Sequence, residues 1–247
     1  MRGLWKLTWI EMKLFLREPM GTFFTLVFPM MLLFLFGSIY GNKPTSFFGG
    51  YGTVDVSVPA YIGIIIATSG LFSLSITMAS YREQGILRRL QATPLSPHAI
   101  LISQVIVLFM MTTLGLILLV IAGKVVFALR FGGNVFNVII AFILSSFSIF
   151  SLGFVIASVM PTARTAQIVA MVLFYPMIFL SGATIPREAL PQTIKQYSQI
   201  LPLTHVVTLM RGFWIGDSWS KHFTEVGILS ALLVIGVIIS AKTFRWE

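Results

Sequence analysis

The side chains that could carry acid–base or ion-binding chemistry lie at the ends of long apolar runs. The chain has eight carboxylates and three histidines, and none of them falls in the middle of such a run. Carriers coupled to protons or sodium usually need ionisable groups at membrane depth, where the coupling ion binds. The pattern therefore argues against an ion-coupled carrier. The residues are Glu11, Glu18, Asp55, Glu83, Glu188, Asp217, Glu225, Glu247, His98, His205 and His222.

The sequence also gives no support for a nucleophilic catalytic site or a nucleotide-binding site. A serine in an apolar run, such as Ser69, would need a histidine base at similar depth, and the runs contain none. The sequence has no HExxH zinc motif, no GxxxxGK[ST] phosphate-binding loop and no cysteine. We therefore predict that the chain is not an enzyme, that it holds no cofactor or metal, and that any ATP is bound by another chain.

The polar groups inside the runs are mostly hydroxyls. Two interpretations stay open: a pathway for an amphipathic substrate lined by hydroxyls and aromatic rings, or contacts between helices, which small residues and hydroxyls commonly make. A proline in the fifth run frees a backbone carbonyl there and joins the pathway candidates. The candidates are Ser69, Ser73, Thr77, Phe147, Ser151, Phe154 and Pro176.

Six apolar runs approach the length of a transmembrane helix. Hydrophobic residues make up 57% of the 247 positions and charged residues 10%, with a mean hydropathy of +0.93. A soluble protein of this size could not bury so much apolar surface, so we expect the bilayer to be its solvent. The predicted fold is an all-α integral membrane protein, a single transmembrane domain over residues 1–247 without a nucleotide-binding domain. The runs are 21–40, 59–80, 99–123, 135–160, 166–185 and 223–241.

The cations follow membrane topology. A net charge of +9 could indicate nucleic-acid binding, but the basic residues flank the apolar runs. Six spans place both termini on one side, which receives ten of the 17 lysines and arginines although the opposite loops are longer. Positive charge concentrates on the cytoplasmic side. We therefore expect an inner or plasma membrane protein with both termini in the cytoplasm and no nucleic-acid partner.

Residues 1–19 precede the first run and form an amphipathic pattern. Arg2, Lys6, Lys13 and Arg17 share one row of a helix, while Leu4, Leu7, Leu14 and Phe15 share another side. Ile10 and Glu11 depart from this division. The pattern indicates a cytoplasmic interfacial helix whose basic row faces anionic lipid headgroups. A polar leader that only sets topology is the alternative.

Residues 186–222 fit neither a span nor a simple loop. Their apolar pieces are broken by Pro191, Pro202 and Gly216. We predict two short helices that re-enter the outer leaflet, where surrounding protein satisfies irregular backbone. An ordinary surface loop with one amphipathic turn remains open.

Residues 81–98 form a short basic segment between the second and third runs. Residues 82–91 can form a helix with Ile86, Leu87 and Leu90 on one side, and Pro94 and Pro97 end it. Such a rigid helix, joined to two spans, could act as a lever for a cytoplasmic motor. The alternative is a positive loop that only fixes topology.

The run YREQGILRRLQATPLS at residues 81–96 resembles the signature of type-2 ATP-binding-cassette permeases, the separate membrane subunits of exporters for drugs, antibiotics, lipids and polysaccharides. The leader, from Trp9-Ile10-Glu11 to Arg17-Glu18-Pro19, precedes the first span as it does in that family. Ser181-Gly182, Leu201-Pro202-Leu203-Thr204-His205 and Arg211-Gly212 resemble its outer segment. The resemblance covers almost the whole chain.

The resemblance implies that the loop carries a coupling helix that docks in a groove of an ATPase subunit. It implies that Gly85 allows close backbone approach, that Leu87 and Leu90 fill the groove, that Arg82 and Arg88 pair with acidic residues, and that Glu83 orients the loop. The implied contact residues are Arg82, Glu83, Gly85, Leu87, Arg88, Leu90, Thr93 and Pro94.

The resemblance also implies the partners: two cytoplasmic P-loop ATPase subunits that bind ATP and magnesium, a second permease subunit of the same or a homologous kind, and membrane lipids. ATP binding would drive alternating access to a pathway for a hydrophobic or amphipathic substrate such as a drug, antibiotic or lipid. The alternatives are an ATP-independent channel or carrier, and a membrane assembly factor. The sequence does not name the substrate, its site, the ATPase or the kind of dimer.

Overall fold

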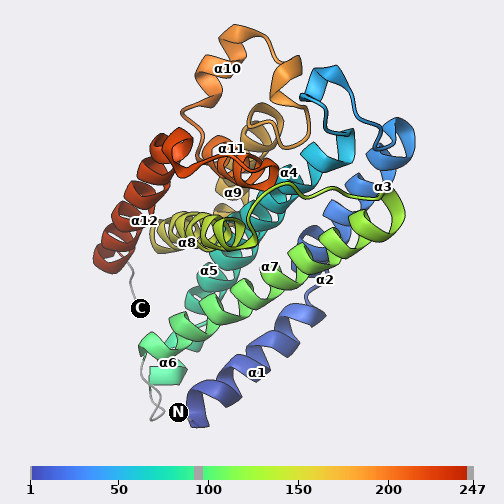
Figure 1. Ribbon diagram of the computed structural model, residues 1–247. Helices are drawn as coiled ribbons and strands as arrows, with labels where there is room; N and C mark the ends of the chain where they lie inside the picture. Colours follow the sequence, from blue (N-terminus) through green and yellow to red (C-terminus); the bar gives the residue numbers. More distant parts are fainter. Residues whose placement is uncertain (1, 92–96, 244–247) are drawn as a thin grey trace.

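The fold is described by a computed structural model that covers residues 2–91 and 97–243, and this part of the chain is helical without a strand (Figure 1). Six of its helices are long and apolar enough to cross a membrane, which confirms the predicted all-α fold. The boundaries differ from prediction by a few residues: the second and fifth spans begin earlier, at capped helix N-termini, and the fifth ends five residues earlier, at Leu180. The spans are Phe23–Tyr40, Thr53–Glu83, Ala99–Phe127, Val135–Val159, Ala163–Leu180 and Trp219–Thr243.

The N-terminal helix α1 (Arg2–Arg17) is amphipathic, as predicted. Its inner side presents Leu7, Glu11 and Phe15 to the protein, and it packs mainly against α7 (Pro97–Phe127). Leu14, expected on the apolar side, is exposed, whereas Glu11 is buried. A short α2 (Pro19–Thr22) and a π-helical segment η1 (Phe23–Val27) lead into α3 (Phe28–Tyr40), which completes the first span.

The second span runs through the centre of the molecule. It consists of α4 (Thr53–Ala67), the π-helical segment η3 (Thr68–Leu74) and α5 (Ser75–Glu83). In its most apolar stretch 83% of the residues are buried by protein, against 11% in the last span, so the other spans surround the second span. It begins six residues before the predicted position 59, because the Asp55 carboxylate accepts the Gly52 N–H at 3.0 Å and so caps α4.

The remaining spans pack around this centre. After α6 (Ile86–Gln91), α7 is followed by α8 (Val135–Val159) and α9 (Ala163–Leu180). Asn134 caps α8, its side-chain oxygen accepting from the Phe136 N–H at 2.8 Å. α8 crosses η3 at Gly153 and Gly70, where the two backbones meet without intervening side chains. α8 also packs along the last helix, α12 (Phe223–Thr243).

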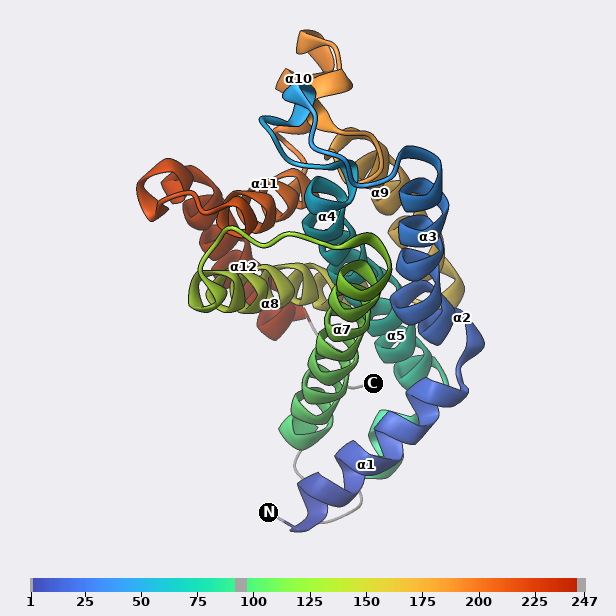
Figure 2. The same cartoon turned by 45° about the vertical axis from the view of Figure 1, so that its right-hand side comes forward.

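Two short α-helices lie in the segment 186–222 before α12, and their re-entry into the outer leaflet stays a prediction. α10 (Gln192–Ser198) projects from one end of the molecule and is largely exposed (Figure 2). α11 (Pro202–Ile215) is buried against α4, α8 and α12. Short 3₁₀ turns complete the connections: η2 (Ser46–Phe48), η4 (Arg187–Ala189) and η5 (Trp219–His222).

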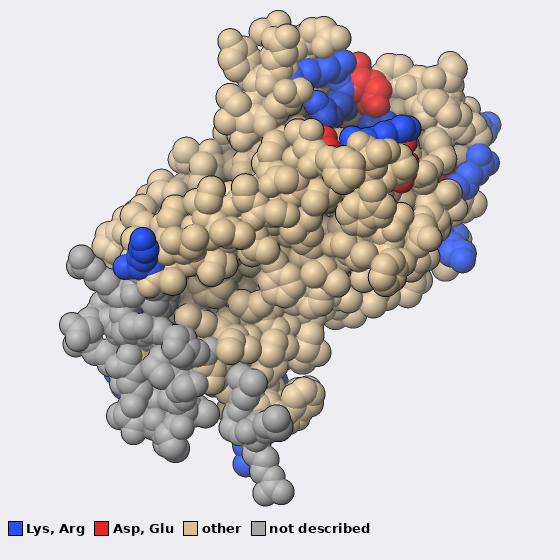
Figure 3. All heavy atoms as spheres, turned by 60° about the vertical axis from the view of Figure 1, so that its left-hand side comes forward, with Lys and Arg blue, Asp and Glu red and all other residues tan. Residues whose placement is uncertain are grey.

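The molecule therefore has two ends, which we name after the short helices α6 and α10. α1, the α5–α6 turn, the connection from α8 to α9 and the end of α12 belong to the α6 end (Figures 1 and 2). On the face shown in Figure 3, charged side chains gather beside the lobe that carries α10, and a broad uncharged band separates them from the opposite end. This distribution fits a protein that spans a bilayer between its two ends.

Candidate functional site

The α5–α6 turn brings the first predicted coupling residues together at the α6 end. α5 ends at Glu83, and Gly85 has a φ of +67°, a left-handed conformation that glycine adopts without a Cβ clash. A Cβ at this position would meet nothing within 4 Å. Within this chain Gly85 is thus needed for its backbone conformation, and its close approach to a partner stays a prediction.

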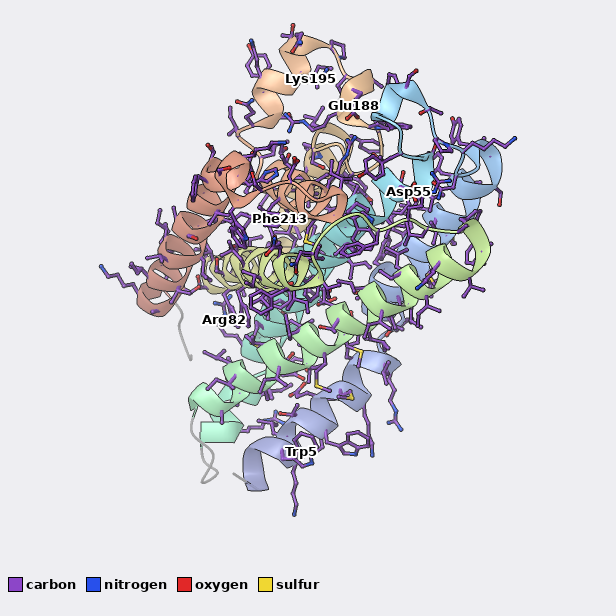
Figure 4. The ribbon with its side chains drawn as sticks, in the orientation of Figure 1. Trp5, Asp55, Arg82, Glu188, Lys195 and Phe213 are labelled. Carbon is purple, nitrogen blue, oxygen red and sulfur yellow. The ribbon has the colours of Figure 1, made fainter. Side chains whose placement is uncertain are left out.

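Arg82 and Glu83 fasten this turn to the connection between α8 and α9, with Arg82 beside α8 (Figure 4). The Arg82 guanidinium donates to the Ser158 carbonyl oxygen at 3.2 Å and also to that of Met160. The Glu83 carboxylate accepts from the Ala163 N–H at 2.8 Å. A cation at the C-terminus of α8 and an anion at the N-terminus of α9 complement the two helix dipoles. Pairing of Arg82 with an ATPase carboxylate stays a prediction.

Leu87 has a different place from the one expected. It is completely buried and packs with Leu7 of α1, Ile100 of α7 and Tyr81 of α5. The expectation that Leu87 fills a groove in an ATPase is therefore wrong in this structure, because α1 and α7 already cover that side of α6. The predicted helix is present as α6, but its Leu87 side chain packs within this chain.

The accessible part of the turn is polar. Gln84 and Arg89 are exposed. The side chains of Arg88 and Leu90, and the whole of Thr93 and Pro94, lie outside the described residues. Their contacts with an ATPase therefore remain predictions.

A buried carboxylate, missed from the sequence, lies behind the turn. Glu11 is 5% exposed, and its Oε2 accepts from the Tyr81 hydroxyl at 2.7 Å and from the Gln104 amide. Burial raises the pKa of Glu11 above its ordinary value, against the opposing effect of these two donors. The available signal was the position of Glu11 near the apolar side of the N-terminal helix. Glu11 thereby links α1 to α5 and α7.

The hydroxyls of the second span face the first span. The Ser69 Oγ lies 3.5 Å from the Thr25 Oγ, and both residues are buried in π-helical segments. Ser73 is buried next to Gly21, where an added Cβ would lie 3.1 Å from its Oγ. Thr77 is half-buried. Ser69 and Ser73 thus occupy a contact between helices, and their role in a pathway stays a prediction.

The three candidates on α8 face different neighbours. The Ser151 Oγ donates to the Ser148 carbonyl oxygen at 2.7 Å and lies 3.3 Å from that of Leu232 in α12. The Phe147 ring stacks on Phe109 of α7 with 5.5 Å between centroids. Phe154 packs on the apolar cluster that includes Phe15 and Met78. The structure therefore does not gather these three candidates around one cavity.

A cavity of 680 Å³ lies instead between the first, second and fifth spans, and we call it the aromatic groove. Its walls combine aromatic rings with hydroxyl groups. Pro176 is exposed on α9 next to two of the lining residues. The sequence signal was the four-residue spacing of the positions on the first span. The lining consists of Phe24, Phe28, Leu32, Phe36, Tyr40, Phe48, Thr53, Ser57, Tyr61, Phe174, Tyr175, Ile178, Phe179, Thr184, Ile185 and Pro186.

A smaller polar cavity of 410 Å³ lies at the α10 end, near the labelled Glu188 and Lys195 (Figure 4). Arg211 pairs with Glu188 at 2.6 Å, and Arg187 donates to the Thr208 hydroxyl at 2.9 Å. Burial by itself would raise the pKa of Glu188, but the Arg211 guanidinium lowers it below the ordinary value. The charged side chains of Arg187, Glu188 and Arg211 at this cavity are therefore engaged in contacts within the outer segment.

Comparisons with known proteins identify the family of the chain. The family described as "ABC-2 type transporter" matches residues 2–214 of the chain. The chain is 24% identical over 214 residues to the "Inner membrane transport permease YhhJ" of Escherichia coli K12, covering 82% of this chain and 54% of that protein. It is 24% identical over 236 residues to the "Putative transport permease ycf38" of Porphyra purpurea, covering 92% and 79%.

A third relative carries a more specific name. The "Probable multidrug ABC transporter permease YbhR" of E. coli K12 is 25% identical over 161 residues, covering 65% of this chain and 44% of that protein. The chain spans about half the length of the two E. coli relatives that it matches.

Proposed function

Because the chain belongs to the ABC-2 type transporter family, we propose that it is the membrane-spanning subunit of an ATP-driven exporter. ATP would be hydrolysed by separate cytoplasmic subunits, with magnesium bound there, and the α6 end would face the cytoplasm. Two such permease subunits, identical or homologous, would face each other around the pathway. The chain itself would make and break no covalent bond.

The observation that carries the coupling part of this proposal is the anchored α5–α6 turn. Arg82 and Glu83 bind it to the α8–α9 connection, so α6 is held rigidly against two spans. Arg89 is left exposed on its surface. An ATPase that contacts α6 could thus displace spans rather than a flexible loop, which is what coupling to a two-state element requires.

The aromatic groove supports the choice of substrate. Its rings bind hydrophobic groups, and the hydroxyls of Ser57, Tyr61 and Thr184 offer polar contacts in the same cavity. A second cavity of 840 Å³ between α7 and α8 has Thr113 and Lys124 as its polar side chains besides Trp214. The aromatic groove carries more hydroxyl groups than the second cavity, which has the charged Lys124 in its wall, so we assign the hydrophobic or amphipathic substrate, drug-like or lipid-like, to the aromatic groove.

Co-purification tests the coupling part. The tagged chain, extracted from its native membrane in mild detergent after cross-linking, should retain a P-loop ATPase. Arg89→Glu should reduce the amount retained, because it reverses an exposed charge on α6. Lys242→Glu, the same change at an exposed position at the end of α12, should not. An eluate of the unmodified chain without ATPase would favour an ATP-independent channel or carrier, or an assembly factor.

Cysteine cross-linking tests the pathway. The chain has no cysteine of its own, so single substitutions report without background. Phe179→Cys, at an exposed edge of the aromatic groove, should form a disulfide-linked dimer if two copies face each other there. Ile121→Cys, equally exposed on α7, should not. A cross-link at Ile121 in place of Phe179 would assign the facing surface to the opposite side.

A further inference from the structure

Glu11 occupies an unusual place for an ionisable group. α1 presents Leu7, Glu11 and Phe15 to the protein at four-residue spacing, and each contacts a different part of the interior. Leu7 packs with Leu87 of the α6 helix, and Phe15 packs with the apolar cluster around Met78 of α5. The carboxylate thus sits between two apolar contacts on the same face of one helix.

The contacts of Glu11 join three helices at one oxygen atom. Its Oε2 accepts from the Tyr81 hydroxyl of α5 at 2.7 Å and from the Gln104 side-chain amide of α7. Tyr81 also belongs to both apolar clusters, so the hydrogen bonds lie between the two areas of apolar packing. We call Glu11, Tyr81 and Gln104 the Glu11 node.

A carboxylate is a costly choice at such a position. A leucine would bury apolar surface without a desolvation penalty, whereas a buried carboxylate needs its hydrogen bonds to offset the loss of water. What hydrogen bonds add over apolar packing is direction, because they fix one rotation and one register of α1 against its neighbours. Apolar side chains alone would tolerate sliding between lipid-like surfaces.

We propose that Glu11 is a positioning residue for coupling, which locks α1, the α5–α6 turn and the beginning of α7 into one rigid unit. The inference rests on the proposed function and deepens it. When an ATPase displaces α6, the node makes α1 move with it. Without the node, α6 would move α5 and α7 while α1 slipped.

The connection from α1 to the aromatic groove is short. The Thr22 hydroxyl donates to the Phe15 carbonyl oxygen at 2.8 Å across the break at Pro19, so the end of α1 stays tied to the start of the first span. Phe24 and Phe28, which follow directly, line the aromatic groove. Displacement of α1 would therefore move one wall of the aromatic groove, while α5 would transmit the displacement of α6 along the second span.

The experiment measures the conformational change at the aromatic groove and does not require the substrate to be known. The chain with Phe179→Cys is reduced so that its thiol is free, purified with its ATPase and reconstituted in vesicles of phosphatidylethanolamine and phosphatidylglycerol. Maleimide labelling of the cysteine is then compared without nucleotide and with ATP, magnesium and vanadate. The probe reads the aromatic groove, and neither the Glu11 node nor α6 contributes a residue to its lining.

Tyr81→Phe removes one hydroxyl and leaves the ring packed. We expect the ATP-dependent change in labelling to fall by about tenfold, the factor that corresponds to about 1.4 kcal/mol for a lost hydrogen bond to a charged group. Co-purified ATPase and thermal stability should change far less, which a merely structural role would not predict. Tyr197→Phe, the same substitution at an exposed position on α10, should leave the response intact.

Substitution of Glu11 itself gives the second readout. Glu11→Ala should abolish the response, and Glu11→Gln should largely restore it, because an amide oxygen can accept both hydrogen bonds. If Glu11→Ala does not fold, Tyr81→Phe decides alone. An unchanged ATP response in Tyr81→Phe overturns the positioning role. No ATP response in the parent chain, with ATPase bound, refutes alternating access itself, and the inference falls with it.

Discussion

Gly153→Ala is the substitution whose effect follows most directly from the structure. α8 and η3 approach so closely at this point that a Cβ on Gly153 would overlap the Gly70 carbonyl oxygen and lie 3.0 Å from its carbonyl carbon. Both groups are backbone, so no side chain can rotate away. A Cβ on Gly70 would likewise meet Ile149, 2.9 Å from its carbonyl oxygen.

The magnitude follows from the separation that the extra carbon requires. Carbon atoms in contact lie about 3.5–4.0 Å apart, so the helices would have to separate by roughly 0.5–1 Å. Overpacking of this kind costs about 1–3 kcal/mol, and the upper part of that range applies to rigid backbone. Alanine recovers about 1 kcal/mol of helix propensity over glycine. The net expectation is a loss of about 2 kcal/mol in the free energy of unfolding.

Gly227→Ala in α12 is the matched control, because a Cβ there meets nothing within 4 Å. It should gain up to about 1 kcal/mol from propensity alone. The two variants then differ by about 3 kcal/mol, so thermal unfolding of the purified chain in mild detergent should separate them by roughly 6–12 °C, at about 2–4 °C per kcal/mol for a chain of this size. Equal midpoints, or a more stable Gly153→Ala, would refute the close backbone crossing.

Three further changes have defined outcomes. Gly85→Ala places a Cβ on a residue in the left-handed conformation and should lower the free energy of unfolding by about 1 kcal/mol. The variant should show a lower thermal midpoint and less co-purified ATPase, and values equal to those of the parent chain would contradict the conformational role of Gly85. Asp55→Ala removes the acceptor for the Gly52 and Arg130 N–H groups and should lower the free energy of unfolding by about 3 kcal/mol, with Asp55→Asn in between. Burial raises the pKa of Glu11, so the contribution of Glu11 to stability is complete below its ordinary pKa of 4.5 and is lost as pH rises through the raised value. The thermal midpoint should therefore fall with pH between about pH 4 and pH 8, and Glu11→Gln should remove this pH dependence. An unchanged pH dependence would assign it to another group, such as Glu18, whose pKa is also raised by burial.

Hydropathy predicted the spans because it measures what the bilayer demands. A run of apolar residues must become a helix in a medium without water, whatever its neighbours are. Helix starts such as Asn134 before α8 depend on local backbone geometry and can be predicted for a similar reason, whereas Pro202, interpreted from the sequence as a break, lies in the first turn of α11. These features require no knowledge of tertiary contacts.

The faces of the helices were not readable in the same way. Lipid tails are as apolar as leucine, so an apolar side chain carries little information on whether lipid or protein covers it. Leu87 and Leu14 illustrate this: Leu87 was expected to face a partner and is buried, whereas Leu14, on the predicted apolar side of the N-terminal helix, is exposed. Glu11 was read as an imperfection because its two donors lie 70 and 93 residues away in the sequence.

The two π-helical segments could not be predicted either, and they lie where the proposed coupling must pass. η1 stands between α1 and α3 in the first span, and η3 stands between α4 and α5 in the second. On one side of them is the unit held by the Glu11 node, and on the other is the aromatic groove. π-helical turns disturb the regular hydrogen-bond ladder and are found often at functional sites. Any displacement of α6 is therefore either transmitted or absorbed at these two segments. Gly153 touches η3 at Gly70, so substitution of Gly153 disturbs η3 and leaves η1 unchanged. If such a variant loses stability but keeps the ATP-dependent labelling of Phe179→Cys, the displacement is transmitted through η1.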